Sequence, residues 1–188
     1  MLKLVCFGDS ITAGTQGLSK PMLTTKLAEH LKEFEIINAG VSGDNTCDAM
    51  SRIQNDVMKH NPDLVTVLFG ANDAAFHKMV DIETYKENLY KIIEHIGSDK
   101  AILISPAPVD EKLQFDRTNN VLSEYSLIVQ EAARDTGSYF IDFFSEFISI
   151  DNYQEKLIGL ENDGLHFGEK GYDILVRLMV SKIKEIHN

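Results

Sequence analysis

The sequence predicts an α/β fold, namely a three-layer α/β/α sandwich around a five-stranded parallel sheet with flavodoxin-like connectivity. Short apolar runs rich in β-branched residues alternate with longer stretches of helical period. The apolar runs are continuous, as is typical of strands that are covered on both faces. No internal repeat, low-complexity segment or linker rich in Pro, Gly and Ser interrupts the 188 residues. We therefore expect a single domain over residues 1–188.

Five apolar runs are the expected strands. They are LKLVCF, FEIINA, LVTVLF, AILIS and SYFID, at residues 2–7, 34–39, 64–69, 101–105 and 138–142. Between and after them, apolar residues recur every three or four positions and so share one face of a helix. The segments with such a face are 23–31, 50–57, 85–96, 121–132 and about 170–186. Right-handed crossovers between parallel strands then place helices on both sides of the sheet.

The composition excludes several classes of partner. Hydrophobic residues make up 44% and charged residues 25% of the chain, which is the balance of a globular protein. The formal net charge is −11 and the sequence pI is near 4.9. A field of that sign repels phosphate backbones and anionic membrane surfaces, so we expect neither nucleic acid nor membrane as a main partner.

Cysteine usage and the start of the chain predict a cytoplasmic protein. Cys6 and Cys47 have no framework spacing and indicate free thiols in a reducing compartment. A catalytic thiol is disfavoured because Cys6 lies inside an apolar run. The first run begins almost at Met1, so no secretory signal precedes it. No apolar stretch approaches the roughly 20 residues that span a bilayer.

Polar residues follow most of the expected strands. In open parallel sheets, sites form beyond the carboxyl ends of the strands. The segments that arrive there are Gly8-Asp9-Ser10, residues 38–46, Gly70-Ala71-Asn72-Asp73 and Ser105-Pro106-Ala107-Pro108, together with residues 161–172 before the last helix. A serine, glycines, an asparagine and an Asp-x-x-His therefore converge on one edge of the sheet.

These groups suit nucleophilic catalysis. A serine hydroxyl becomes a nucleophile when a histidine takes its proton and a carboxylate orients that histidine. Asp163 precedes His166 by three residues, which can bring its carboxylate to Nδ1 and leave Nε2 for Ser10. The same spacing is found where an aspartate caps a helix beside an ordinary histidine. The histidines without such a partner are His30, His60, His77, His95 and His187, and we expect these at the surface.

Acyl transfer also needs hydrogen-bond donors for the developing oxyanion. The candidates are the backbone N–H groups of Ser10 and Gly43 and the side-chain amide of Asn72. Each has a structural explanation by itself, because glycine suits a turn with positive φ and asparagine suits an Asx-turn. Their joint arrival at one sheet edge favours the catalytic interpretation.

Four sequence blocks carry a resemblance to a known family. GDSIT at 8–12, VSGDNT at 41–46, GAND at 70–73 and DGLH at 163–166 resemble, in order, the blocks of the GDSL, or SGNH, hydrolases. The resemblance spans Gly8 to His166. It implies a three-layer α/β/α fold and the hydrolysis of carboxylic esters without a metal or organic cofactor. The chain is most similar to small bacterial lipase/acylhydrolase-type esterases and more distantly similar to isoamyl acetate-hydrolysing esterases.

The resemblance also implies roles for individual residues. Ser10 would be the nucleophile and an oxyanion donor, Gly43 and Asn72 the other donors, His166 the base and Asp163 the residue that orients it. Isoleucine replaces the leucine of the first block, which exchanges one aliphatic side chain for another. No long insertion separates the blocks to form a lid, so an open site is expected and the size of the substrate stays open.

The surroundings of the site are predicted from position alone. We expect Asp9 and Asp73 just behind the catalytic groups, with Asp73 hydrogen-bonded to Asn72. The apolar residues that flank the blocks are candidates for a pocket for a short acyl chain or small alkyl group, or for ordinary packing. They are Phe76, Pro106, Pro108, Leu165 and Phe167. The partner is then a small-molecule ester: an alkyl ester, a sugar O-acetyl ester, a thioester or a lysophospholipid.

Two other functions stay open. A metal-dependent phosphoesterase could gather Asp9, Asp73, Asp163 and His166 around divalent ions. Against it, the sequence has no early Asp-x-His motif and no basic clamp for phosphate. A flavodoxin-like binding domain without turnover would leave the serine, asparagine and Asp–His pair unexplained. No GxSxG, GxxxxGK[ST] or GxGxxG motif occurs, so Ser42 is a poor rival nucleophile and nucleotide binding is not indicated.

Overall fold

A computed structural model describes residues 1–187 of the chain. One sheet runs through the molecule, and all its neighbouring strands are parallel. Its strands are β1 (Leu2–Gly8), β2 (Phe34–Gly40), β3 (Leu64–Leu68), β4 (Ala101–Ile104) and β5 (Tyr139–Ile141), in the order β2-β1-β3-β4-β5. The prediction of a five-stranded parallel sheet in an α/β fold is confirmed.

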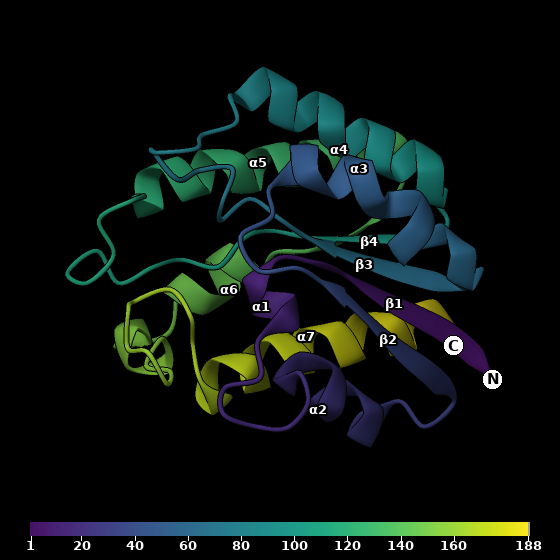
Figure 1. Cartoon of the computed structure of the whole chain (residues 1–188), viewed down its shortest axis with the longest axis horizontal. Coiled ribbons are helices and arrows are strands. Elements are labelled where there is room, and N and C mark those ends of the chain that lie inside the picture. The colour runs from purple at the N-terminus through teal and green to yellow at the C-terminus, as the bar shows by residue number, and fades with distance from the viewer. Residues whose placement is uncertain (188) are drawn as a thin grey trace.

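Helices cover both faces of this sheet (Figure 1). On one face lie α3 (Thr46–Asp56), α4 (Ile82–Ile96) and α5 (Asn119–Thr136). On the other lie α2 (Met22–His30) and α7 (Glu169–His187), with the short α1 (Ser10–Ala13) and α6 (Phe143–Ile148). Two 3₁₀ turns, η1 (Met58–His60) and η2 (Tyr153–Lys156), complete the elements of the described chain.

Strand β1 shows why the apolar runs are continuous. Leu4, Val5, Cys6 and Phe7 are all fully buried. Val5 and Phe7 pack in the core under α3, α4 and α5, whereas Leu4 and Cys6 pack in the core under α2 and α7. Successive side chains of a strand point to opposite faces, so a strand covered on both faces needs apolar residues at every position. Burial also raises the pKa of the Cys6 thiol to about 12, which keeps it protonated.

The apolar pattern underestimates the length of helices that begin with polar residues. Helix α3 starts at Thr46, four residues before the predicted face at 50–57. Its first turn is held by a capping box, in which Asn45 accepts from Cys47 and Asp48 N–H groups and Asp48 accepts from the Asn45 N–H. Helices α1 and α6 are missed altogether because four and six residues are too short to show a helical period.

The strands end level with one another, and this positions the site. Gly8, at the end of β1, pairs with Gly40 of β2 and Leu68 of β3, and Leu68 pairs with Ile104 of β4. The segments after these strands therefore leave the sheet at the same edge. Glycine suits position 8, because a Cβ there would overlap the hydroxyl oxygen of Thr12 and crowd the carbonyl oxygen of Leu68. Within residues 1–187, no helix is both long and apolar enough to traverse a membrane.

Candidate active site

The structure brings Ser10, His166 and Asp163 into one hydrogen-bonded line. Ser10 is the first residue of α1, and His166 lies in the segment before α7. The Ser10 Oγ is 2.9 Å from His166 Nε2, and His166 Nδ1 is 2.6 Å from Asp163 Oδ2. These contacts have the geometry of a nucleophile, a base and a carboxylate that orients the base.

Backbone donors hold the Asp163 carboxylate in place. Its Oδ1 accepts hydrogen bonds from the N–H groups of Leu165, at 3.0 Å, and His166, at 2.8 Å. Burial raises the pKa of Asp163, but the hydrogen bonds from His166 and Leu165 outweigh it and leave the pKa below its ordinary value. Asp163 is therefore an ionised acceptor at neutral pH, as the orientation of a neutral imidazole by its Nδ1–H requires.

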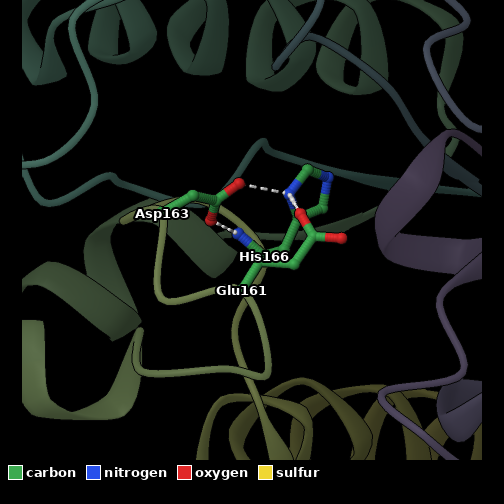
Figure 2. A group of neighbouring side chains, drawn as sticks. All are labelled: Glu161, Asp163 and His166. Carbon is green, nitrogen blue, oxygen red and sulfur yellow. Dashed lines mark hydrogen bonds and ion pairs between the residues drawn. The ribbon is translucent and has the colours of Figure 1, made fainter.

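A second carboxylate lies beside the same ring nitrogen. Figure 2 shows Glu161 and Asp163 both directed at His166 Nδ1, with the Glu161 Oε2 3.8 Å from it. The Glu161 side chain is 69% exposed. The spacing of the sequence blocks gives no signal for this residue, because Glu161 lies outside all four.

These three side chains are also the one group with possible metal-ligand spacing in the described part of the chain. The candidate ligand atoms of Glu161, Asp163 and His166 lie within 4.8 Å of one another. Asp9 and Asp73 do not join them, so the four-residue cluster that a phosphoesterase would need is not formed. Because Nδ1 is engaged by Asp163 at 2.6 Å, we interpret the group as an acid–base set and not as metal ligands.

The loop after β2, which carries Gly43, is tied to the end of β1 and to the loop after β3. Val41 N donates to Gly8 O at 3.0 Å, and Asn72 Nδ2 donates to Asp44 O at 2.8 Å. Gly43 has a φ of +86°, the left-handed conformation that favours glycine. Among residues 1–187, neither the Ser10 nor the Gly43 N–H donates to a protein oxygen, so both are free to bind a ligand.

Arg52 of α3 supports this arrangement, and sequence reasoning missed it. Its Nη2 donates to Gly8 O at 2.9 Å, its Nη1 to Ala39 O at 2.8 Å and its Nε to Asp44 Oδ2 at 2.5 Å. The guanidinium also lies 4.7 Å from the centre of the Phe7 ring. The Arg52 side chain thus connects the carboxyl ends of β1 and β2 with Asp44, which lies in the loop just before α3.

The predicted hydrogen bond from Asp73 to Asn72 is wrong. Asp73 Oδ1 instead accepts from the N–H and hydroxyl of Thr46, at 2.9 and 2.6 Å, and so anchors the first turn of α3. Its Oδ2 is buried without a partner. Burial raises the pKa of Asp73 to about 6, although the Thr46 hydrogen bonds oppose the shift. Adjacent residues at a strand end point in different directions, so neighbours in sequence need not bond.

Asp9 and Arg117 are buried charges behind the site. Asp9 is 2% exposed and caps α1 by accepting from Ile11 N at 2.9 Å. Burial raises the pKa of Asp9 to about 6, and the nearby charge of Asp73 adds to the shift. Arg117 is 3% exposed, its Nε and Nη1 have no partner, and burial lowers its pKa. The attraction of Asp116, Asp9 and Asp163 opposes that shift.

A hollow of about 280 Å³ contains Ser10 and His166. Its other walls are Ala13, Gly14, Thr15, Gln16, Gly17, Ser42, Leu160 and Glu161. Gln16 Oε1 accepts from Leu160 N at 2.9 Å and so joins the segment after α1 to the segment before α7. The hollow is therefore built mainly from residues 10–17 and 160–166, which lie far apart in the sequence, together with Ser42 of the loop after β2.

None of the five predicted pocket residues lines this hollow. Phe167 is fully buried and packs against Phe143 and Tyr172, while Phe76 is 52% exposed. Leu165 and Pro106 line a separate enclosed void of about 10 Å³, and Pro108 is buried. Leu165 and Phe167 flank His166 but face the interior, because successive side chains of a non-helical segment tend to point to opposite sides.

A family model, curated relatives and solved structures all match this chain to esterases and lipase/acylhydrolases. Residues 6–174 match the model of the GDSL-like lipase/acylhydrolase family. The isoamyl acetate-hydrolyzing esterase 1 homolog of Homo sapiens is 29% identical over 92% of this chain and 77% of its own. A lipase/acylhydrolase structure from Enterococcus faecalis is 34% identical, covers 98% of this chain and 96% of its own, and has a TM-score of 0.92.

A more distant structure supports the fold alone. An acetyl xylan esterase from Geobacillus stearothermophilus is 23% identical, covers 97% of this chain and 94% of its own, and has a TM-score of 0.78. Both solved structures thus extend over nearly the whole chain, which agrees with the single sheet and its two covered faces.

Proposed function

The chain belongs to the GDSL-like lipase/acylhydrolase family and is a carboxylic ester hydrolase, and we propose that Ser10, His166 and Asp163 are its catalytic triad. The observation that carries the proposal is the line of hydrogen-bond contacts from Ser10 Oγ to His166 Nε2 and from His166 Nδ1 to Asp163 Oδ2. A serine in this setting can lose its proton as it attacks.

In the proposed reaction, Ser10 Oγ attacks the carbonyl carbon of the ester while His166 Nε2 takes the hydroxyl proton. Asp163 holds Nδ1–H and stabilises the imidazolium that forms. His166 then gives the proton to the departing alcohol as the carbon–oxygen bond breaks, which leaves an acyl group on Ser10. A water molecule repeats the two steps, releases the acid and restores the serine.

The oxyanion of each tetrahedral intermediate would be held by three donors. These are the free N–H groups of Ser10 and Gly43 and the Asn72 amide, which has a second hydrogen besides the one given to Asp44 O. Removing one such donor commonly lowers kcat about 100- to 1,000-fold. These steps use protein groups alone, so the proposed reaction needs no metal or organic cofactor.

We infer that the acyl group is small, with acetyl esters as the first substrates to test. The hollow of about 280 Å³ is slightly smaller than the roughly 300–1,000 Å³ found for pockets that bind drug-sized ligands. Thr15, Gln16, Ser42 and Glu161 give it a largely polar wall. Two of the similar proteins are named for acetate esters, isoamyl acetate in one and acetyl xylan in the other.

A fluorophosphonate probe tests the nucleophile directly. We expect one covalent adduct by intact mass on the natural protein and none on Ser10→Ala. The matched control is Ser42→Ala, because Ser42 lines the same hollow but has no contact with His166 among its hydrogen bonds. If Ser10→Ala still forms the adduct, Ser10 is not the activated serine. The same conclusion follows if Ser42→Ala fails to form the adduct while Ser10→Ala forms it.

A further inference from the structure

Two side chains of the loop after β3 hold consecutive carbonyl groups of the loop after β2. Asn72 Nδ2 donates to Asp44 O at 2.8 Å, and Lys78 Nζ donates to Gly43 O at 2.6 Å. Building on the proposed function, we propose that Lys78 is a positioning residue for the oxyanion hole. Its ammonium group fixes the Gly43 turn and brings a positive charge to the loop that carries one of the proposed oxyanion donors.

The two ends of the Gly43 turn are held by the bond from Val41 N to Gly8 O and by the contacts of Asp44 with Asn72 and Arg52, but the turn between them has little other support. Val41, Ser42 and Gly43 are exposed, and the backbone bond within the turn, from Asp44 N to Val41 O, is long at 3.3 Å. A Cβ built on Gly43 would find only Lys78 Nζ within 4 Å, at 3.7 Å. Packing therefore cannot set the direction of the Gly43 N–H. Hydrogen bonds to the turn's carbonyls must do so.

The backbone that carries Lys78 is itself well anchored. Lys78 N donates to Ala75 O at 3.0 Å, Val80 N donates to Asp73 O at 2.9 Å, and Phe76 N donates to Asp116 O at 2.7 Å. The loop is thus bonded on both sides of Lys78 and to the segment before α5. A rigid base allows a long side chain to place its ammonium group reproducibly.

The charge of Lys78 stands out in an acidic site. The four segments that surround the hollow and the oxyanion donors, residues 8–17, 40–46, 70–80 and 160–168, contain Lys78 and no other lysine or arginine. The carboxylates of Asp9, Asp73, Glu161 and Asp163 lie on the same four segments. Arg52 is committed to Asp44, Asp56 and two carbonyl groups. Arg117 is buried behind the site, where Asp116, Asp9 and Asp163 attract it. Lys78 is therefore the cation on the segments that carry the oxyanion donors, where negative charge develops.

Steady-state kinetics on an acetyl ester separate positioning from general structural support. Lys78→Met should lower kcat about tenfold or more and change KM less than about twofold, because the interaction serves the transition state. Lys78→Arg, which keeps a charged donor, should recover activity to within about threefold of the natural protein. The matched control is Lys59→Met, which removes the same charge from an exposed position in η1 and should leave kcat unchanged.

Inhibitor binding gives a second readout. A boronic acid forms an anionic tetrahedral adduct with a catalytic serine, whereas a neutral amide imitates the ground state. Lys78→Met should weaken boronate binding by about the same factor as kcat and leave amide binding unchanged. Circular dichroism of each variant reports whether the fold is kept.

The outcomes distinguish this proposal from the function on which it rests. If the natural protein hydrolyses esters and Lys78→Met matches it within twofold, or if Lys59→Met falls equally, the positioning role of Lys78 is overturned. Equal weakening of the boronate and the amide would assign Lys78 to substrate binding and overturn it as well. If the natural protein shows neither hydrolysis nor a Ser10 adduct, the proposed function fails, and the role of Lys78 fails with it.

Discussion

The buried carboxylate of Asp73 should make stability depend on pH in a way that Asp73→Asn removes. In the folded protein, burial raises the pKa of Asp73 from 3.8 to about 6. The folded state therefore holds a proton over a pH range in which the unfolded chain has released it. The stabilisation from this proton is full below about pH 4 and is lost as the pH rises through about 6.

The magnitude follows from the same two values. For pKa values of 3.8 and about 6, linkage gives about 1.4 kcal/mol of stabilisation at pH 5 and almost none at pH 8. The introduced asparagine would not titrate, yet its Oδ1 could still accept from Thr46 N and Oγ1. The stability of Asp73→Asn minus that of the natural protein should therefore increase by at least about 1.4 kcal/mol from pH 5 to pH 8, because loss of the Asp73 charge also removes part of the rise in the pKa of Asp9.

Urea denaturation at pH 5 and pH 8 measures this difference. The substitution also puts an amide N–H where Oδ2 has no partner, which costs about 1–3 kcal/mol at either pH and cancels in the comparison. Asp151→Asn, at an exposed turn, is the control and should show no such change. A difference that stays constant between the two pH values would refute the buried, proton-binding carboxylate.

Three further predictions concern the site and its support. Asp163→Asn should lower kcat roughly 10³- to 10⁴-fold, because an amide donor at Nδ1 favours the wrong tautomer of His166; a loss below tenfold in ester kinetics would contradict that role. EDTA should leave ester hydrolysis unchanged, and a loss restored by added divalent ion would return the metal hypothesis. Gly8→Ala should destabilise the fold by about 1–3 kcal/mol, because its Cβ would collide with Thr12; an unchanged urea midpoint would show that the end of β1 can shift at little cost.

The strands and the catalytic segments were predictable because their signals are local. A strand covered on both faces needs a continuous apolar run, so Leu4 to Phe7 mark β1 without any knowledge of the partners. The level ends of parallel strands then bring Ser10 and Asn72 to one edge. The family blocks connected Ser10 with His166, which lies 156 residues later, and the structure has the two side chains 2.9 Å apart.

The sequence by itself therefore determined the fold class, the five strands and the edge at which the polar segments gather. Apart from the pairing of Ser10 with His166, only the tertiary structure decided which side chains face each other there. In the structure, Asp73 accepts a hydrogen bond from Thr46, and Leu165 and Phe167 are buried. A hydrogen bond from Leu160 N to Gln16 Oε1 joins the two main segments that line the hollow. The physical reason is that hydrophobic periodicity follows from burial along one element. A hydrogen bond between two loops depends on side-chain directions that neither loop encodes alone.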